Sequence, residues 1–162
     1  MDLMLKVVFQ ILKHMNIKRH KNIIIFIAIV VIIMSFFGFK KEKIFLIVYT
    51  HKSFLNECIK NQTYEKASKI IGIKKITPYS LRNKEKFVDF YCSGSGLVPN
   101  SVYYGFYYIS NDRPLGFQAK SVEFKSDGDG WRWEEKWENP NSDNWMYTEK
   151  ITDNWYYYEA GF

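Results

Sequence analysis

Hydrophobic residues are concentrated in one uninterrupted run at 22–39, NIIIFIAIVVIIMSFFGF, which contains no charged side chain. As a helix, these 18 residues would extend about 27 Å, close to the roughly 30 Å hydrocarbon core of a bilayer. A single segment pairs all its backbone amides in lipid only as a helix. A buried core element is the weaker alternative, because the run is apolar on every face and the rest of the chain is small. The run therefore predicts one transmembrane helix.

The sequence after this run contains no small-x-small cleavage site. The run is also longer than the roughly 7–15 apolar residues of a cleaved signal peptide, which favours an uncleaved signal anchor. Before the run, residues 1–21 carry apolar side chains at helical spacing, at Met4, Val8, Ile11 and Met15. This pattern predicts an amphipathic helix in the membrane interface, and the alternative is a disordered tail.

Residues 40–85 form a basic helical and linker segment by pattern. Ile44–Tyr49 (IFLIVY) is apolar but too short to span a membrane, so it either continues the helix or forms a first strand. Apolar residues then recur at spacings of three and four over 53–71, which predicts one helix or two short ones. Gly72 suits the end of a helix, and Thr77–Ser80 with the residues up to Lys84 is typical of a turn and loop.

The hydrophobic period changes at residue 86. Short stretches rich in aromatic and β-branched residues alternate with turn signals such as SGSG, SNDRP and SDGDG. Six strands are predicted, at 87–92, 101–109, 115–124, 131–137, 145–151 and 155–159. Turns at intervals of this length are typical of an antiparallel meander, which forms a small sheet, a sandwich or an open barrel. The predicted fold class is therefore α+β, with a transmembrane helix, a short helical segment and an aromatic-rich β domain at 86–162.

A short motif, D-[GN]-W-x-[WY], begins at Asp129, Asp143 and Asp153. Asp followed by Gly or Asn favours a turn with positive φ, and the aromatic residues after it begin a strand. The copies are unequally spaced, so the motif marks hairpins and does not indicate a solenoid.

The tryptophans give the β domain its candidate binding residues, since all five lie between Trp131 and Trp155. One interpretation is that these rings simply fill the core of a domain that is poor in Leu and Val. The other is a core plus an outer face that binds a glycan or a protein, because consecutive residues of a strand face opposite sides. The candidates are Trp131, Trp133, Trp145, Tyr147, Trp155 and Tyr157.

The net charge of +6 is unevenly distributed. Residues 40–86 carry twelve Lys/Arg and four Asp/Glu, a net +8, whereas residues 121–162 carry four and ten, a net −6. A basic segment beside a predicted span favours contact with anionic lipid over nucleic-acid binding. Five Lys/Arg precede the span and four follow it closely. This small difference favours a cytoplasmic N-terminus and a C-terminal domain outside.

Catalytic and metal-binding patterns are missing from the sequence of the β domain. All three histidines, His14, His20 and His51, precede it, which excludes histidine-based catalysis and zinc sites there. Cys58 and Cys92 are too few for a four-thiolate metal site, and either pair as a disulfide or remain buried free thiols. The DGDG sequence at 127–130 is better explained as a polar turn than as a calcium loop. We therefore predict no metal, no cofactor and no enzymatic activity.

A carboxylate-pair hydrolase is the least favoured interpretation, with Glu134, Glu135, Asp143 and Glu149 as its candidate acids. The C-terminal part of the chain is similar in its general residue pattern to small uncharacterised bacterial surface or membrane proteins, including some toxin-immunity proteins. The similarity lies in YYGFYYISNDRPLGF and DNWMYTEKITDNWYYYEAGF. No residue role follows from that similarity. The sequence predicts a single-pass membrane protein whose non-enzymatic domain binds a protein partner. The alternative is a glycan-binding or cell-wall-binding module that uses exposed Trp and Tyr.

Overall fold

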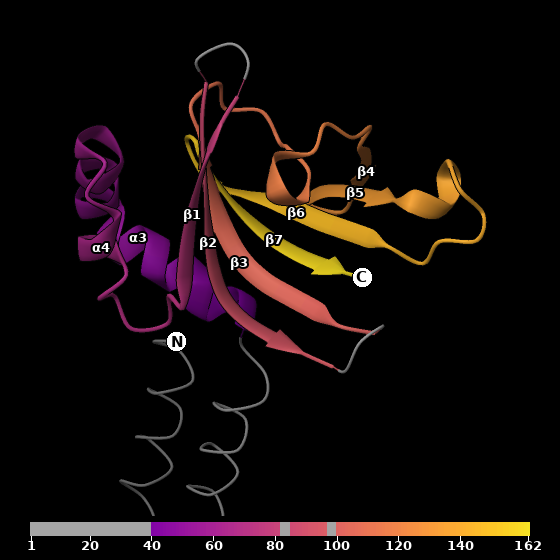
Figure 1. The fold of residues 1–162 in the computed structure, drawn as a ribbon, viewed down its shortest axis with the longest axis horizontal. Coiled ribbons are helices and arrows are strands. Elements are labelled where there is room, and N and C mark those ends of the chain that lie inside the picture. The colour runs from indigo at the N-terminus through magenta and orange to yellow at the C-terminus, as the bar shows by residue number, and fades with distance from the viewer. Residues whose placement is uncertain (1–39, 82–84, 97–99) are drawn as a thin grey trace, which may run out of the picture. The chain divides into compact units, whose positions relative to one another are not determined.

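The computed structural model describes residues 40–81, 85–96 and 100–162. The predicted interfacial segment at 1–21 and the predicted transmembrane helix at 22–39 lie outside these residues. Across the three described ranges, no helix combines the length and the apolar character that a membrane crossing requires. Residues 40–162 form a compact unit with their own apolar cores (Figure 1).

Helix α3, Lys40–Asn61, is the long helix of this unit. Its buried side chains are Ile44, Val48, Leu55, Cys58 and Ile59, which form one apolar stripe against the sheet. The IFLIVY segment therefore lies in a helix and is not a first strand. Its predicted continuity with the span concerns residues outside the described ranges. The predicted start at residue 53 is wrong, because the helix already begins at Lys40. Gln62 has a positive φ of 55° and separates α3 from the short helix α4, Tyr64–Ala67.

Seven antiparallel strands form a single open sheet in the order β1-β2-β3-β7-β6-β5-β4. Their bounds are β1 Lys75–Ser80, β2 Lys86–Ser95, β3 Val102–Ile109, β4 Lys125–Asp127, β5 Gly130–Glu134, β6 Trp145–Thr152 and β7 Trp155–Gly161. Strands β1–β3 are one meander and β4–β7 are a second, and β7 joins them by pairing with β3. The predicted class, α+β with an antiparallel meander, is confirmed for the described residues.

Strand β1 lies in a segment that the sequence pattern assigns to a turn and linker. Pro78 suggested the turn, because proline has no amide hydrogen to donate to a sheet. At the edge of the sheet this loss is tolerated, since Pro78 pairs with Val88 of β2 on one side only. The β domain therefore begins at Lys75 rather than at residue 86.

The predicted strand at 115–124 is also wrong. The connection from β3 to β4 contains the 3-10 turn η1, Phe117–Ala119, in which Gln118 and Ala119 both have positive φ. Its apolar side chains pack on the sheet instead of pairing with it: Leu115, Phe117, Ala119, Val122 and Phe124. Alternate side chains of this connection pack onto the sheet, so its apolar residues repeat with the period of two that is typical of a strand. This repeat explains why a strand was predicted. A second 3-10 turn, η2 Glu135–Trp137, similarly ends β5 before the predicted residue.

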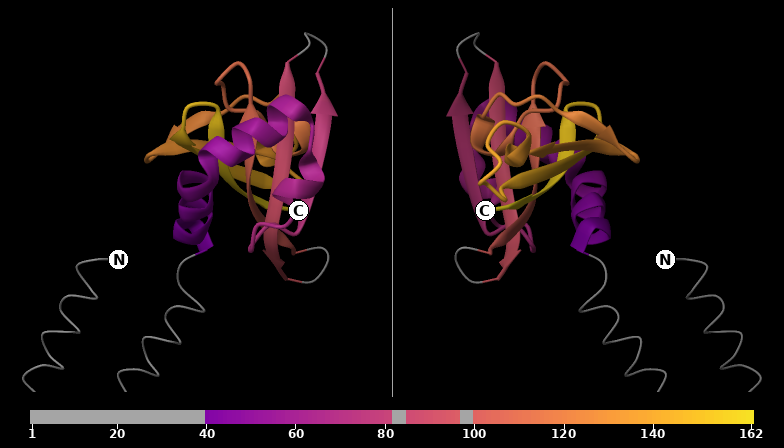
Figure 2. Two further views of the ribbon diagram at one scale, coloured as in Figure 1. Left: turned by 90° about the vertical axis from the view of Figure 1, so that its left-hand side faces the viewer. Right: turned by 90° about the vertical axis from the view of Figure 1, so that its right-hand side faces the viewer.

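Both faces of the sheet are covered. Helices α3 and α4 cover one face, as the side views show, and the connection from β3 to β4 packs on the other (Figure 2). The consecutive side chains of β7 consequently alternate between the two cores. Trp155 and Tyr157 belong to the helix-side core, and Tyr156 and Tyr158 to the opposite one. The alternation was predicted correctly, but none of these four rings is left on an outer face.

Aromatic pairs fix the register between the central strands. Phe90 and Phe106 are partners in the β2–β3 ladder and stack with ring centroids 4.6 Å apart. Tyr107 and Tyr156 are partners across β3–β7 and stack at 5.2 Å. A slip of one residue would exchange the two faces and separate these rings, so the stacked pairs specify the alignment of the sheet.

The third copy of the D-[GN]-W-x-[WY] motif forms the β6–β7 hairpin turn. Asn154 has a φ of 67°, as the motif predicts, and its side-chain amide donates to the carbonyl oxygens of Ile109 and Ser110. The first copy differs, since the positive φ falls on Gly128 and not on Gly130. The β6–β7 turn is thus fastened to the end of β3, where the candidate pocket is found.

Candidate binding pocket

The six aromatic residues predicted to form a binding face do not lie together. Trp155, Tyr157 and Trp133 are 0%, 2% and 4% exposed, and the other three are half-buried. Trp155, Tyr157 and Tyr147 contact the helix-side core, whereas Trp133 and Trp131 contact the opposite core. The candidates therefore serve mainly to fill the two cores.

Cations lie over several of the partly exposed aromatic rings of β6 and η2. The Arg132 guanidinium lies 5.2 Å from the centroid of Trp145 and 5.9 Å from that of Tyr147. Trp137, 38% exposed, has the Lys125 ammonium 3.9 Å from its ring. A sugar ring would have to displace these cations before it could stack. This arrangement does not favour the glycan-binding alternative.

The cysteines and the carboxylates show no arrangement typical of catalysis. Cys58 and Cys92 are buried free thiols of the helix-side core, so the candidate disulfide is not formed. Burial raises the pKa of Cys92 to about 12. Three of the four candidate acids interact with different lysines: Glu134 with Lys136, Glu135 with Lys120 and Glu149 with Lys41. In the described part of the chain, no group of three or more His, Cys, Asp or Glu could hold a metal ion.

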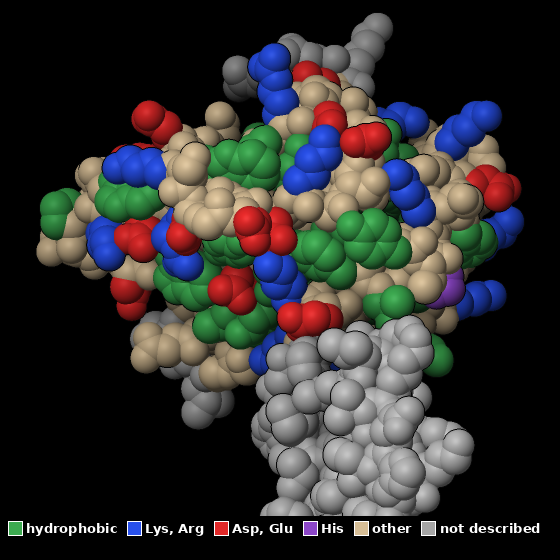
Figure 3. All heavy atoms as spheres, turned by 180° about the vertical axis from the view of Figure 1, so that it is seen from behind, with side chains coloured by type: hydrophobic (Ala, Val, Ile, Leu, Met, Phe, Trp, Pro, Cys, Tyr) green, Lys and Arg blue, Asp and Glu red, His purple; other side chains and the backbone are tan. Residues whose placement is uncertain are grey.

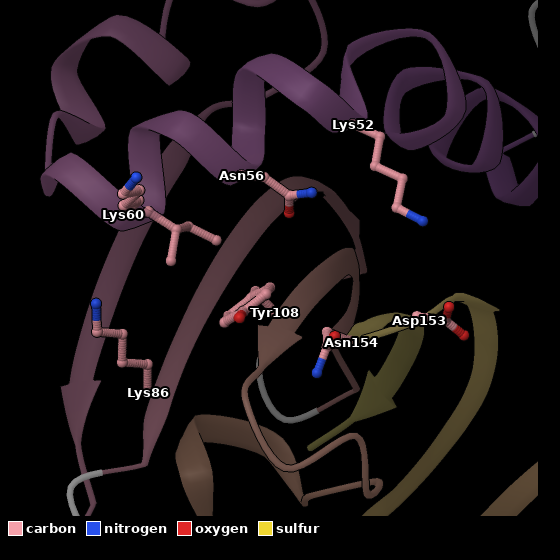
Figure 4. A pocket seen from close by; sticks show the side chains of 8 residues that line it. Lys52, Asn56, Lys60, Lys86, Tyr108, Asp153 and Asn154 are labelled. Carbon is pink, nitrogen blue, oxygen red and sulfur yellow. The ribbon is translucent and has the colours of Figure 1, made fainter.

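An open pocket of about 460 Å³ lies between α3, the start of β2, the end of β3 and the β6–β7 turn (Figure 4). Its lining residues are Lys52, Asn56, Ile59, Lys60, Lys86, Tyr108, Asp153 and Asn154. The volume falls within the roughly 300–1,000 Å³ of small-ligand sites. We take this pocket as the candidate functional site, because it gathers polar groups from four separate segments.

Helix α3 supplies one wall of the pocket through three polar side chains. Lys52, Asn56 and Lys60 are spaced by four residues and therefore lie along one side of the helix. In Figure 4, Lys60 and Lys86 lie on one side of Tyr108, and Lys52 lies on the other. The i, i+4, i+8 spacing was present in the sequence. The sequence alone did not indicate that Lys86 and Tyr108 would face it from the sheet.

Hydrogen bonds hold the walls in place. The Trp155 indole donates to Oδ1 of Asn56 at 3.0 Å, which leaves the amide nitrogen of Asn56 as the group that can donate further. The Lys52 ammonium donates to the Thr152 hydroxyl at 2.7 Å and so ties α3 to β6. Trp155 was predicted to stack against a glycan. Its indole instead orients the side chain of Asn56 in the pocket.

The pocket is positively charged. Its lining contains three lysines and one aspartate, a net +2. Asp153 is 82% exposed at its side chain and pairs with Lys150 at 3.4 Å. Within the described ranges, Lys60 and Lys86 form no ion pair, and the Tyr108 hydroxyl forms no hydrogen bond. On the surface seen from behind, acidic, basic and hydrophobic side chains are intermixed (Figure 3).

The groups available in the pocket are mainly hydrogen-bond donors. Three ammonium groups, the Asn56 amide and the Tyr108 hydroxyl can all donate. Such a lining suits an anionic group, and it includes no Cys, Ser or His that could act as an activated nucleophile or general base. The arrangement supports binding.

Comparison of the chain with protein-family models, with curated proteins and with solved structures finds no match.

Proposed function

We propose that this chain is a single-pass membrane-anchored module without enzymatic activity, which binds a protein partner through the pocket beside α3. The observation that carries the proposal is the convergence of two lysines from different elements, Lys60 of α3 and Lys86 of β2, on one pocket. Neither lysine forms an ion pair within the described ranges, whereas Asp127 pairs with Arg132 and Asp112 with Lys150. Like charges gathered in one pocket can be compensated by a partner of opposite charge.

The rigidity of the walls supports this proposal. Asn56 and Lys52 are held by hydrogen bonds to β7 and β6, and the β6–β7 turn is held by Asn154. A preorganised site loses less conformational entropy when a partner binds. The glycan-binding alternative has weaker support, because its candidate rings are buried or covered by cations.

The proposed location follows from the sequence. The anchor is the apolar run at 22–39, the N-terminus is cytoplasmic, and the domain lies outside. Protease treatment of spheroplasts that carry the full chain with a C-terminal epitope tests this orientation. Digestion of the tag agrees with it, and a protected tag in intact spheroplasts would place the domain inside.

Site-specific photo-cross-linking tests the proposed partner binding. A photoreactive residue replaces Asp153 at the pocket rim in the full chain, which is expressed in its membrane, so that Lys60 and Lys86 stay in place. Glu57, an exposed acidic residue of α3 that is not part of the lining, provides the matched control. We expect a protein adduct from position 153 and none of that mass from position 57. No adduct at either position, or equal adducts at both, would contradict binding at the pocket.

A further inference from the structure

We infer that the group bound in the α3 pocket is a pair of neighbouring carboxylates in an acidic segment of the partner. This inference rests on the proposed function and specifies its ligand. Because the lining carries a net +2, two carboxylates neutralise it, whereas one would leave Lys60 or Lys86 uncompensated. The two lysines lie on different elements, α3 and β2, so they can meet different oxygen atoms of such a pair.

Carboxylate fits this lining better than phosphate. The pocket contains no arginine, whose planar fork pairs with phosphate, and no glycine-rich turn that could present several amides to it. Asp153 adds a negative charge to the rim. A phosphate group gathers a charge of about −1.5 to −2 at one point, whereas two carboxylates can divide it between Lys60 and Lys86, on the side of Tyr108 away from Asp153 (Figure 4).

The apolar part of the lining also suits an acidic side chain. Ile59 is buried, and Tyr108 packs edge-on against Trp155 with centroids 5.3 Å apart. These groups form a small apolar surface beside the ammonium groups. The methylene carbons of a glutamate can lie on such a surface while its carboxylate reaches a lysine.

A protein segment is favoured over a lipid headgroup by the same chemistry, because an acidic segment supplies two separate carboxylates and a phospholipid headgroup supplies a phosphate. The lysines nearest the predicted span in the sequence, Lys40 and Lys41, do not line the pocket and are placed over Tyr104 and beside Glu149.

Calorimetric titration of the full chain in uncharged detergent micelles tests this inference. The probes are a capped Gly-Glu-Glu-Gly peptide, inorganic phosphate and glycerol phosphate, the last of which represents a lipid headgroup. The test variant is Lys60→Gln with Lys86→Gln. The control is Lys66→Gln with Lys69→Gln, which removes the same charge from exposed positions outside the pocket.

We expect the peptide to bind the native chain more tightly than either phosphate. The test variant should bind it roughly tenfold more weakly, and the control should keep native affinity. Equal losses in both variants would overturn the inference, because they would show unspecific attraction. Tighter binding of either phosphate, or an unchanged affinity of the test variant, would also overturn it.

The two experiments separate this inference from the proposed function. An adduct at position 153 without peptide binding would leave partner binding intact and reject the acidic ligand. Peptide binding without an adduct would keep the carboxylate site and reject the protein partner. The photoreactive residue at position 153 leaves Lys60 and Lys86 in place, so the two outcomes are independent.

Discussion

Asp89 is expected to destabilise the folded domain at neutral pH. It lies on β2, pairs with Thr77 and Tyr107 across the ladders, and is 8% exposed. Burial raises the pKa of its carboxyl from 3.8 to about 6, although Tyr158 and Lys75 lower it in part. The Tyr158 hydroxyl interacts with this carboxyl but forms no hydrogen bond of standard geometry in the described structure. The ionised form is thus incompletely compensated.

The magnitude follows from the two pKa values. The folded state binds the Asp89 proton more tightly than the unfolded state, so the free energy of unfolding falls as the pH rises from about 4 to about 6. Above that window the loss is complete, and at about 1.4 kcal/mol per pH unit it amounts to roughly 3 kcal/mol. Asp89→Asn removes this cost. We expect the variant to gain about 2–3 kcal/mol at pH 8 and little at pH 4.

Urea unfolding of the full chain in detergent, followed by tryptophan fluorescence, measures the effect. All five tryptophans lie between Trp131 and Trp155, so the signal reports on the β domain. A variant that is no more stable than the native chain at pH 8 would refute the reasoning. It would show that ionised Asp89 makes compensating interactions.

Asp112→Asn is the matched control. Partial burial raises the pKa of Asp112, but hydrogen bonds from Lys150, Asn154 and Tyr156 outweigh this and lower it overall. The stability that Asp112 contributes is therefore present above its unfolded pKa and is lost as the pH falls through the folded value. The control variant should be less stable than the native chain at pH 8, with a pH dependence of opposite sign.

Three further predictions concern other parts of the domain. Lys41→Ala should destabilise the domain by about 1–2 kcal/mol, because it leaves the buried Glu149 carboxylate without its cation. The loss should be smaller than for a fully buried pair, since Lys41 is partly exposed. Adding Glu149→Gln should recover part of the lost stability in the same urea assay. Gly105→Ala should lower the free energy of unfolding by more than about 2 kcal/mol, since the new Cβ would lie 2.7 Å from the Tyr158 hydroxyl and closer still to a backbone oxygen. Gly128→Asn is the control, because this position is open and has a positive φ that Asn tolerates. Thermal unfolding should show it to be nearly as stable as the native chain. The Cys92 thiol, with its pKa raised to about 12 by burial, should resist iodoacetamide at pH 8 in the folded chain and react in urea, as mass spectrometry would detect; rapid alkylation of the folded chain would contradict its burial.

Local patterns predicted the elements whose side chains repeat regularly. The strands at 145–151 and 155–159 correspond to β6 and β7, because their ladders keep an uninterrupted alternation over most of their length. Strand β1 was not predicted, because Pro78 and Ser80 are residue types that are common in turns. Their strand conformation depends on pairing with β2, a contact that the local sequence does not reveal.

The pocket was harder to predict than the fold. The spacing of Lys52, Asn56 and Lys60 is apparent once a helix is assigned, but the predicted helix began at residue 53 and left Lys52 outside it. Lys86 and Tyr108 reach the pocket only through the register of β2 and β3, in which Val88 is the partner of Tyr108. The aromatic residues were chosen as candidates because they are numerous. Most of them are buried in the two cores on either face of the sheet and serve packing.

The central position of β7 has a consequence for the order in which the domain can be assembled during synthesis. Tyr108 is the partner of Trp155, so β3 lacks one neighbour until almost the whole domain has left the ribosome. The core around α3 is also incomplete until then, because it includes Trp155 and Tyr157 as well as Val88, Phe90 and Phe106 of the earlier strands. Such long-range pairing is slow to form. Strands β2 and β3 can therefore cover part of the apolar side of α3 first, and β7 completes this core last.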